Sequence, residues 1–350
     1  MTARHILTYA RTLEGGGVER AQLRLIRGWI AMGRRVTLVL GDAAGPLTGE
    51  LPPGIDLTVL GDGRYRALIG ALPGIVRRSM PDVIFCPGNY YTSVAAVTKL
   101  RLGSACPPII AKMSNAPDRG DHNAIVDVGH RIWLALHGRF LDRLVAMTPA
   151  TAAAAARMLR MTGRTSVIAN PPVAPAVSAA AAALPPGRVI LGVGRLVPQK
   201  RWDRLIAALP ALPADVSLVI LGEGSLRPAL EQQARDLGIA DRVHLPGHSD
   251  GPLTAMAAAS LVALTSDYEG VPGVLREALS VGTPVVATDS SEAVAEIVSD
   301  PTLGTIVGRD DAAGLAAALN HWLDAPRPAP VPQPGAGSAQ AYLDLFDTLA

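Results

Sequence analysis

Short apolar runs alternate with helical stretches along the whole chain, and this alternation predicts the fold. Runs such as 83–86 and 261–264 are continuously apolar, whereas 19–32 and 65–78 repeat apolar residues every three or four positions. The first pattern is typical of buried parallel strands and the second of amphipathic helices. The predicted strands are 5–9, 36–40, 56–60, 83–86, 109–112, 144–147 and 166–169, then 189–193, 217–221, 242–245, 261–264, 284–287 and 305–307.

A segment rich in proline and alanine, 171–187, divides this pattern into two series of βα units. Strands that alternate with helices form parallel sheets, so we predict an α/β protein with two doubly wound, Rossmann-like domains, 1–170 and 188–325. A second proline-rich segment, 326–337, suggests that a C-terminal helix at 338–350 packs back on the first domain. Open parallel sheets bind ligands at the carboxyl ends of their strands, so the site is expected in a cleft between the domains.

Composition excludes several classes of protein. Of the 350 residues, 49% are hydrophobic and 18% charged, so the chain can bury a full core and is not disordered. Aromatic residues make up 4%, too few for a nucleic-acid stacking platform. No apolar run is long enough to span a bilayer, and the N-terminal apolar segment, interrupted by Arg11, is too short for a signal peptide. Cys86 and Cys106 make neither a disulfide framework nor a zinc site, so we expect a cytoplasmic protein without a structural metal.

The net charge of +2 conceals two oppositely charged halves. Residues 1–170 contain 21 Lys+Arg and 11 Asp+Glu, a balance of +10, and residues 171–350 contain 11 and 19, a balance of −8. A basic first half suits an anionic acceptor or an anionic membrane surface. Solvated faces that merely differ in sign are the alternative.

Glycine-rich loops follow two of the predicted strands. Gly16 and Gly17 precede the first helix, where the backbone can approach a ligand and a helix N-terminus attracts anions. Gly222 and Gly224 permit a tight turn, after which Ser225 would cap the next helix. Each loop is also compatible with an ordinary turn.

The loop after 189–193 carries positive charge. Gly194 is followed by Arg195 and Lys200, and Val197 stands where a dinucleotide-binding Gly-x-Gly-x-x-Gly motif needs its third glycine. Two cations at the carboxyl end of a strand can neutralise a pyrophosphate. The alternative is a pair of solvated surface cations.

The most informative segment is 264–279. Glu269 lies in its Gly/Pro loop, and Glu277 lies one turn inside the helix that begins near Val274. The loop N–H groups and the helix N-terminus can hold phosphate, and a carboxylate on the first turn can accept hydrogen bonds from a ribose diol. The two glutamates are too far apart for a capping box.

Together these motifs resemble the retaining GT-B glycosyltransferases of family four. In order along the chain, the matching segments are Gly-Gly-Gly-Val-Glu-Arg at 15–20, Val-Gly-Arg-Leu-Val-Pro-Gln-Lys at 193–200, Leu-Gly-Glu-Gly-Ser-Leu-Arg at 221–227, Leu-Gly-Ile-Ala-Asp-Arg-Val-His-Leu-Pro-Gly at 237–247, Glu269 and Glu277 with seven residues between them, and Gly-Thr-Pro-Val-Val-Ala-Thr at 282–288. The resemblance covers nearly the whole chain and implies the two-domain GT-B architecture.

The resemblance also implies a role for each matching residue. Arg195 and Lys200 would bind the diphosphate of the donor and stabilise the leaving nucleotide. Glu269 would contact the donor sugar, and Glu277 the ribose. Transfer would retain configuration and need no metal, since the two cations stabilise the departing diphosphate. The further donor-binding positions that it implies are Gly16, Gly17, Gly194, Glu223, Val271, Pro272, Gly273 and Val274.

The chain departs from the family pattern at its glycine loop. The common Glu-Gly-Phe-Gly is Glu-Gly-Val-Pro-Gly at 269–273, which resembles enzymes that extend lipid-linked oligosaccharides and surface polysaccharides. Many relatives place a histidine near the sugar, and His122, in the polar loop 114–123, is a stronger candidate than His130 or His137. The candidates for contact with the acceptor in this loop are Ser114, Asn115 and Asp118.

A peripheral membrane contact is a further hypothesis for the first domain. Its support is Trp133, Leu134 and Leu136 together with nearby basic residues. The alternative is a helix packed by its apolar face on its own sheet. The basic residues are Arg77, Arg78, Lys99, Arg101, Arg131 and Arg139.

The sequence therefore favours a glycosyltransferase that moves a sugar from a nucleotide diphosphate, a UDP-sugar before GDP-mannose, to a hydroxyl of a glycan or lipid-linked glycan. We expect no cofactor, no nucleic-acid partner, and a cytoplasmic location at the inner face of the membrane. A non-catalytic nucleotide-sugar-binding protein is the alternative, against which Lys200 and Glu277 argue. An NAD-dependent oxidoreductase is disfavoured by Val197.

Overall fold

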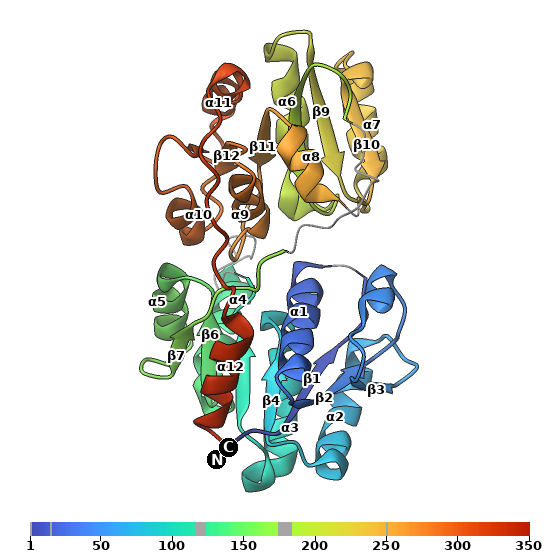
Figure 1. Ribbon diagram of the computed structural model, residues 1–350, viewed down its shortest axis with the longest axis vertical. Helices are drawn as coiled ribbons and strands as arrows, with labels where there is room; N and C mark the ends of the chain where they lie inside the picture. Colours follow the sequence, from blue (N-terminus) through green and yellow to red (C-terminus); the bar gives the residue numbers. More distant parts are fainter. Residues whose placement is uncertain (1, 15, 116–123, 174–183, 250) are drawn as a thin grey trace. The chain divides into compact units, whose positions relative to one another are not determined.

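The computed structural model describes residues 2–14, 16–115, 124–173, 184–249 and 251–350. It divides into two compact units, each built around one parallel sheet (Figure 1). The first unit comprises Met1–Pro172 together with Pro334–Ala350, and the second comprises Val173–Gln333. The α/β fold class predicted from the alternating pattern is confirmed.

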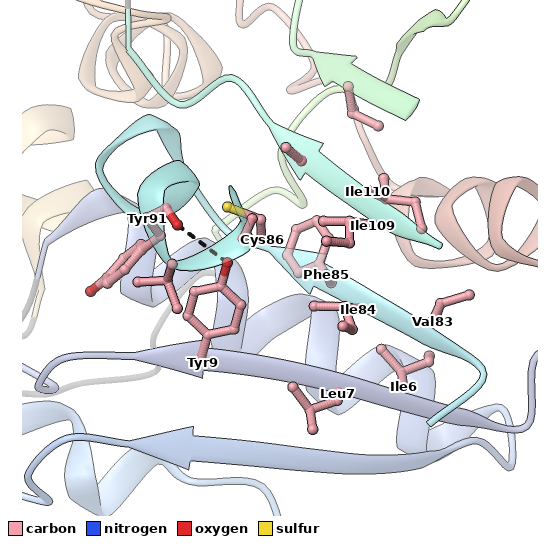
Figure 2. Close-up of a cluster of buried hydrophobic side chains, with 14 of the residues drawn as sticks. Ile6, Leu7, Tyr9, Val83, Ile84, Phe85, Cys86, Tyr91, Ile109 and Ile110 are labelled. Atoms are coloured by element: carbon pink, nitrogen blue, oxygen red, sulfur yellow. Dashed lines mark hydrogen bonds between the residues drawn. The ribbon is translucent and has the colours of Figure 1, made fainter. Parts of the chain in front are cut away.

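The sheet of the first unit has seven parallel strands in the order β3-β2-β1-β4-β5-β6-β7. Its centre is continuously apolar, because both faces of a parallel sheet are covered. Ile6 and Leu7, neighbours on β1, are both fully buried, and Figure 2 shows them beside Ile84 and Phe85 of β4. The strands are β1 (His5–Ala10), β2 (Arg35–Leu40), β3 (Asp56–Val59), β4 (Val83–Cys86), β5 (Ile109–Lys112), β6 (Arg143–Ala146) and β7 (Thr165–Val167).

A helix from the C-terminal end of the chain completes the first unit. Helix α12 (Ser338–Asp347) packs against α1 (Gly17–Ala31) (Figure 1). A Cβ on Gly28 would lie 2.6 Å from the side chain of Ala339, so glycine at this position permits the close approach. The other helices of this unit are α2 (Tyr65–Ser79), α3 (Thr92–Leu102), α4 (Ala124–Leu136) and α5 (Pro149–Met158).

The sheet of the second unit has six parallel strands in the order β10-β9-β8-β11-β12-β13. The strands are β8 (Arg188–Val193), β9 (Val216–Leu221), β10 (Val243–Gly247), β11 (Leu261–Leu264), β12 (Val285–Thr288) and β13 (Gly304–Val307). The helices are α6 (Trp202–Ala208), α7 (Arg227–Asp236), α8 (Pro252–Ala258), α9 (Gly273–Ser280), α10 (Glu292–Ile297) and α11 (Ala312–Asp324).

The proline-rich segment after α11 is tied to the second unit. The Arg327 guanidinium donates to the Gly282 carbonyl at 3.1 Å, and the Val331 N–H donates to the Leu279 carbonyl at 2.9 Å. This segment therefore runs along the second unit before the chain returns to the first at Pro334.

Candidate active site

The second unit gathers charged side chains at the carboxyl ends of β8 and β11. Lys200 ends a short 3-10 turn in the loop after β8, and Glu269 lies in the loop after β11. The Lys200 ammonium donates to Glu269 Oε1 at 2.6 Å, and the Ser266 hydroxyl donates to the same oxygen at 2.6 Å. The Lys200 and Glu269 side chains are 15% and 11% exposed. The structure thus joins two of the predicted site residues in a nearly buried ion pair.

Hydrogen bonds connect the loops that carry this pair. The Asp267 N–H donates to the Gln199 carbonyl at 2.9 Å, and the Gln199 side chain donates to the Tyr268 carbonyl at 2.8 Å. The Glu269 N–H donates to the Ser290 carbonyl, in the loop after β12, at 2.9 Å. The main chain around Glu269 is therefore held from two sides, as a preorganised polar site requires.

Arg195 follows a close crossing of two loops. A Cβ on Gly222 would lie 2.0 Å from the Gly194 carbonyl oxygen, and Gly222 has φ of 152°, so only glycine fits there. The Arg195 carbonyl accepts a hydrogen bond from the Trp202 indole at 3.0 Å. Arg195 itself is exposed, and within the described parts of the chain its guanidinium makes no ion pair. The backbone of Arg195 is fixed while its charge is open to an anionic ligand.

Glu223 is held by a partner that the sequence did not suggest. Arg227, the first residue of α7, donates to its carboxylate through both Nε and Nη2. This contact holds the pKa of Glu223 below its ordinary value. The predicted cap at Ser225 is wrong, since Leu226 occupies the N-cap position and no side chain caps this helix. The chain makes one further turn, in which the Gly224 carbonyl accepts from the Arg227 N–H, before α7 begins.

The Gly/Pro loop leads into α9 without a side-chain cap. Pro272 occupies the N-cap position, and Gly273 and Val274 form the start of the helix. N–H groups of an uncapped first turn can donate to an anion. Glu277 is half-buried, with its Oε1 only 3.5 Å from where a Cβ on Gly273 would stand. The Glu277 carboxylate therefore lies beside the first turn of α9, while Val271 packs against the core of the second unit.

In the first unit, two glycines begin α1. Gly16 is the N-cap residue and Gly17 the first residue of the helix. A Cβ on Gly16 would lie 2.3 Å from Glu19 Oε2, so the Glu19 carboxylate folds back over the start of its own helix. A carboxylate there compensates the positive end of the helix dipole.

The loop after β5 is shaped by Asn89, which was not among the predicted site residues. Its side-chain oxygen accepts from the N–H groups of Ser114, at 2.7 Å, and Asn115, at 3.2 Å, and its amide donates to the Asn115 carbonyl at 2.9 Å. The Gly88-Asn89 pair after a strand was an available signal, because such pairs form turns. The candidates His122 and Asp118 lie outside the described residues.

His137 belongs to the core of the first unit. Its ring nitrogen Nδ1 lies 2.9 Å from the Trp133 carbonyl, and its ring packs against that of Phe140. Burial lowers the pKa of His137. These contacts agree with its interpretation as an ordinary helix-face histidine.

The described residues show neither a cluster suited to a metal ion nor a helix suited to a membrane span. They contain no group of three or more His, Cys, Asp or Glu side chains placed to hold a metal ion. In the same residues, no helix has both the length and the apolar character needed to cross a membrane.

Two family models match the chain. The model described as Glycosyltransferase Family 4 matches residues 15–171, and the model described as Glycosyl transferases group 1 matches residues 179–331. The two matches correspond closely to the two series of βα units.

Two curated relatives resemble part of the chain. One is the N-acetylgalactosamine-N,N'-diacetylbacillosaminyl-diphospho-undecaprenol 4-alpha-N-acetylgalactosaminyltransferase of Campylobacter jejuni, 34% identical over 39% of this chain and 38% of the relative. The other is the GDP-mannose-dependent alpha-(1-6)-phosphatidylinositol monomannoside mannosyltransferase of Mycolicibacterium smegmatis, 36% identical over 40% of this chain and 39% of the relative. Each match thus spans about two-fifths of the relative's length.

The fold resembles that of Anabaena Alr3699/HepE, whose crystal structure is known in complex with UDP-glucose. The TM-score is 0.75 at 22% sequence identity, over 98% of this chain and 95% of the other. At this identity the likeness concerns the fold, and it confirms the predicted GT-B architecture.

Proposed function

The chain belongs to the glycosyl transferases of group 1, and on that premise we propose that it transfers a sugar from a nucleotide diphosphate donor to a hydroxyl group of a glycan. The observation that carries the proposal is the nearly buried ion pair of Lys200 and Glu269. Along the sequence, the exposed Arg195 precedes this pair and the uncapped N-terminus of α9 follows it. Cations and N–H groups at the carboxyl ends of parallel strands are typical of sites for phosphorylated ligands.

In the proposed reaction, the bond between the anomeric carbon and the phosphate oxygen breaks as the acceptor oxygen attacks from the same face. The proton of the acceptor hydroxyl passes to the departing diphosphate. Arg195 and Lys200 stabilise the charge that develops there, which lowers the barrier without a metal. Glu269, oriented by Lys200 and Ser266, contacts the sugar hydroxyls, and Glu277 holds the ribose.

We further propose a UDP-sugar as the donor and a lipid-linked glycan as the acceptor. The Anabaena structure contains UDP-glucose, and the Campylobacter relative acts on a diphospho-undecaprenol-linked sugar. The Mycolicibacterium relative depends on GDP-mannose, which makes GDP-mannose the second candidate.

A peripheral contact with an anionic membrane surface, at the inner face of the membrane, is part of the proposal. On α4, Val128 and Ile132 are each 59% exposed, and Arg131 between them is also exposed. The residues first considered for this contact face the protein instead, since Leu134 is buried and Trp133 is half-buried in the core. The exposed pair one turn apart gives the helix a small apolar face beside positive charge, as membrane-surface helices have.

The first test is a thermal-shift and calorimetric screen with UDP, GDP, dTDP and ADP. Binding raises the melting temperature by mass action, so one nucleotide should give a clear rise. Lys200→Met should remove that rise, and Lys99→Met, which changes a lysine that pairs with Asp142 in the first unit, should keep it. A response that survives Lys200→Met would contradict the assigned donor site.

Transfer is then assayed with the donor class so identified and Glu277→Gln as the variant. Wild-type protein should transfer sugar to a lipid-linked acceptor with retention and in the presence of EDTA, and the variant should lose most of this activity. Donor binding without hydrolysis or transfer would instead favour the non-catalytic alternative.

A further inference from the structure

Lys112, the last residue of β5, is a buried lysine that pairs with no other described residue. Its side chain is 2% exposed, and no residue described by the structure makes a hydrogen bond or ion pair with its ammonium group. Burying a charge is costly unless a counter-charge or hydrogen bonds compensate it. The position therefore calls for an explanation beyond packing.

The chain uses lysine sparingly, and its other lysines are paired. Of the 32 Lys+Arg residues, the only lysines are Lys99, Lys112 and Lys200. Lys200 contacts Glu269 at 2.6 Å, and Lys99 lies 3.6 Å from an Asp142 oxygen. Lys112 is thus the most buried lysine, and among the described residues it is the only lysine without a carboxylate partner.

The charged end of Lys112 is enclosed but is not among the completely sealed polar atoms that lack a partner. In the described residues, the fully buried side-chain nitrogen and oxygen atoms that lack a partner belong to Trp29, Ser290, Ser291 and Tyr342. The Lys112 ammonium is not one of these sealed atoms. The residue as a whole is 2% exposed, so a ligand that binds the ammonium must reach it at this nearly enclosed end of the side chain.

The surroundings favour an anion. Burial and, to a smaller extent, the positive charge of Arg24 of α1 lower the pKa of Lys112 to about 7, although Glu19 of the same helix opposes this effect. Lys112 thus lies within electrostatic range of one arginine and one glutamate of α1. The Ser114–Asn115 turn follows directly at the carboxyl end of β5, the edge at which parallel sheets bind ligands.

We propose that Lys112 is an acceptor-binding residue that holds an oxyanion, a phosphate or a carboxylate, of the glycan acceptor. That the anion belongs to a glycan acceptor rests on the proposed function, but anion binding at Lys112 can be tested without any transfer assay. A bound oxyanion would supply the contacting counter-charge that no described residue provides to Lys112.

The first experiment follows the three lysines by NMR in protein labelled at the lysine ε-carbons. Lys112→Arg and Lys99→Arg variants assign the signals. Sulfate, whose charge is constant near neutral pH, should shift the Lys112 signal saturably towards the protonated form, in comparison with chloride at equal ionic strength. The Lys99 signal should not move, and Lys200→Met protein should give the same Lys112 response, because that variant removes the donor-site lysine. A Lys112 signal indifferent to sulfate would overturn the proposal.

Two further arms separate the sources of the oxyanion. Methyl phosphate represents a lipid-linked diphosphate, and glucuronate represents an acidic sugar. The arm that shifts the Lys112 signal at the lower concentration identifies the class of acceptor group, and failure of both would contradict the proposal even if sulfate binds.

The kinetic test uses Lys112→Met, which keeps the size of the side chain and removes its charge. KM for the acceptor should rise at least tenfold, while nucleotide binding and donor hydrolysis stay within twofold of the wild type; Lys99→Met is the matched control. An unchanged acceptor KM in folded Lys112→Met protein would sink the inference and leave the proposed function intact. If the wild type transfers no sugar at all, the proposed function fails and the NMR response still decides the anion site.

Discussion

Lys200 and Glu269 each contribute to both the proposed function and the stability of the protein. Removing one partner of a nearly buried ion pair leaves the other charge uncompensated. We expect Lys200→Met to lower the free energy of unfolding by about 2 kcal/mol, less than for a fully enclosed pair because both side chains keep some exposure. Urea denaturation at neutral pH measures this loss.

The double variant Lys200→Met/Glu269→Gln separates the two roles. It should regain most of the lost stability, because no buried charge is left unpaired, yet it should bind nucleotide no better than Lys200→Met. A double-mutant cycle in which the two changes add independently would show that the pair does not couple in solution.

Lys112 gives stability a pH dependence that its replacement should remove. Its pKa is about 7 in the folded protein and near 10.5 in the unfolded chain. The unfolded state therefore holds more protons between these values, and stability rises with pH across that window. Below pH 7 the full penalty of the buried charge applies.

The free energy of unfolding of the wild type and of Lys112→Met should depend differently on pH. From about pH 7 to 9, the stability advantage of Lys112→Met over the wild type should shrink by about 1.4 kcal/mol per pH unit. The charged groups that act on Lys112, Glu19 and Arg24 of α1, are the same in both proteins, so the comparison isolates Lys112 itself. Parallel stability curves for the two proteins would show that the Lys112 pKa is not depressed.

Local sequence identified residues whose role follows from their own loop. Lys200 and Glu269 could be paired because each follows an apolar strand, and the carboxyl ends of parallel strands meet at one edge. The hydrogen bonds from Arg227 to Glu223, and the burial of Lys112 without a partner among the described residues, were not predicted. Both depend on distances fixed by packing: Lys112 reads as an ordinary polar strand end until the folded structure encloses it.

Among the elements, strands were predicted more closely than helices. The runs 83–86, 109–112 and 261–264 coincide with β4, β5 and β11, because a strand buried on both faces is apolar along most or all of its length; only β5 ends in a charged residue, Lys112. Helix α3 has no counterpart in the prediction, since Thr92–Leu102 lacks a regular apolar stripe. The helix that carries Trp133 and Leu134, α4, ends at Leu136 and gives way to a 3-10 turn. The order of the strands in the sheets was beyond the pattern, because pairing is non-local.

The Asp347 carboxylate ties the C-terminal end of helix α12 to the rest of the first unit. Asp347 accepts hydrogen bonds from the Ala3 N–H and the Arg34 guanidinium, both at 2.8 Å. Asp347→Ala leaves two donors without this partner and should cost about 1–3 kcal/mol of stability. Asp344→Ala is the control, because among the described residues the exposed Asp344 side chain bonds only to Gln340 of its own helix.

Hydrogen exchange locates the effect of Asp347→Ala. Amide protection in α12 and in α1 should fall together, since Trp29 of α1 packs its ring edge-on against Tyr342 and Phe346. Loss of protection in α12 alone would mean that the first unit keeps its core without the returning helix. Equal stability of the Asp347 and Asp344 variants would show that packing alone secures α12.

On the scale of the whole molecule, the two halves of the sequence differ in net charge, much as the fold divides into two units. The first half of the sequence carries a balance of +10 and the second half −8. The net charge near zero therefore describes neither half, and a surface that attracts the first half does not attract the second. A negative membrane surface attracts basic segments by about 1 kcal/mol for each residue close to it.

This asymmetry and the exposed face of α4 predict binding to anionic vesicles. The full chain should co-sediment with phosphatidylglycerol-containing vesicles at low salt and not with phosphatidylcholine alone. Added salt should weaken the binding, because the screening length falls from about 10 Å at 0.1 M to about 3 Å at 1 M. Residual binding at high salt would report the apolar contribution of Val128 and Ile132.

The apolar contribution is isolated by Val128→Ser/Ile132→Ser. Removing two inserted side chains should lower the partition coefficient about tenfold or more while leaving the salt dependence unchanged. Leu237→Ser is the matched control, since Leu237 is 43% exposed in the acidic second unit. If both variants bind as the wild type does, the first half attracts the membrane by charge alone, and α4 is not the contact. If the wild type binds neutral and anionic vesicles equally, the charge division has no part in locating the protein, and the proposed membrane contact fails with it.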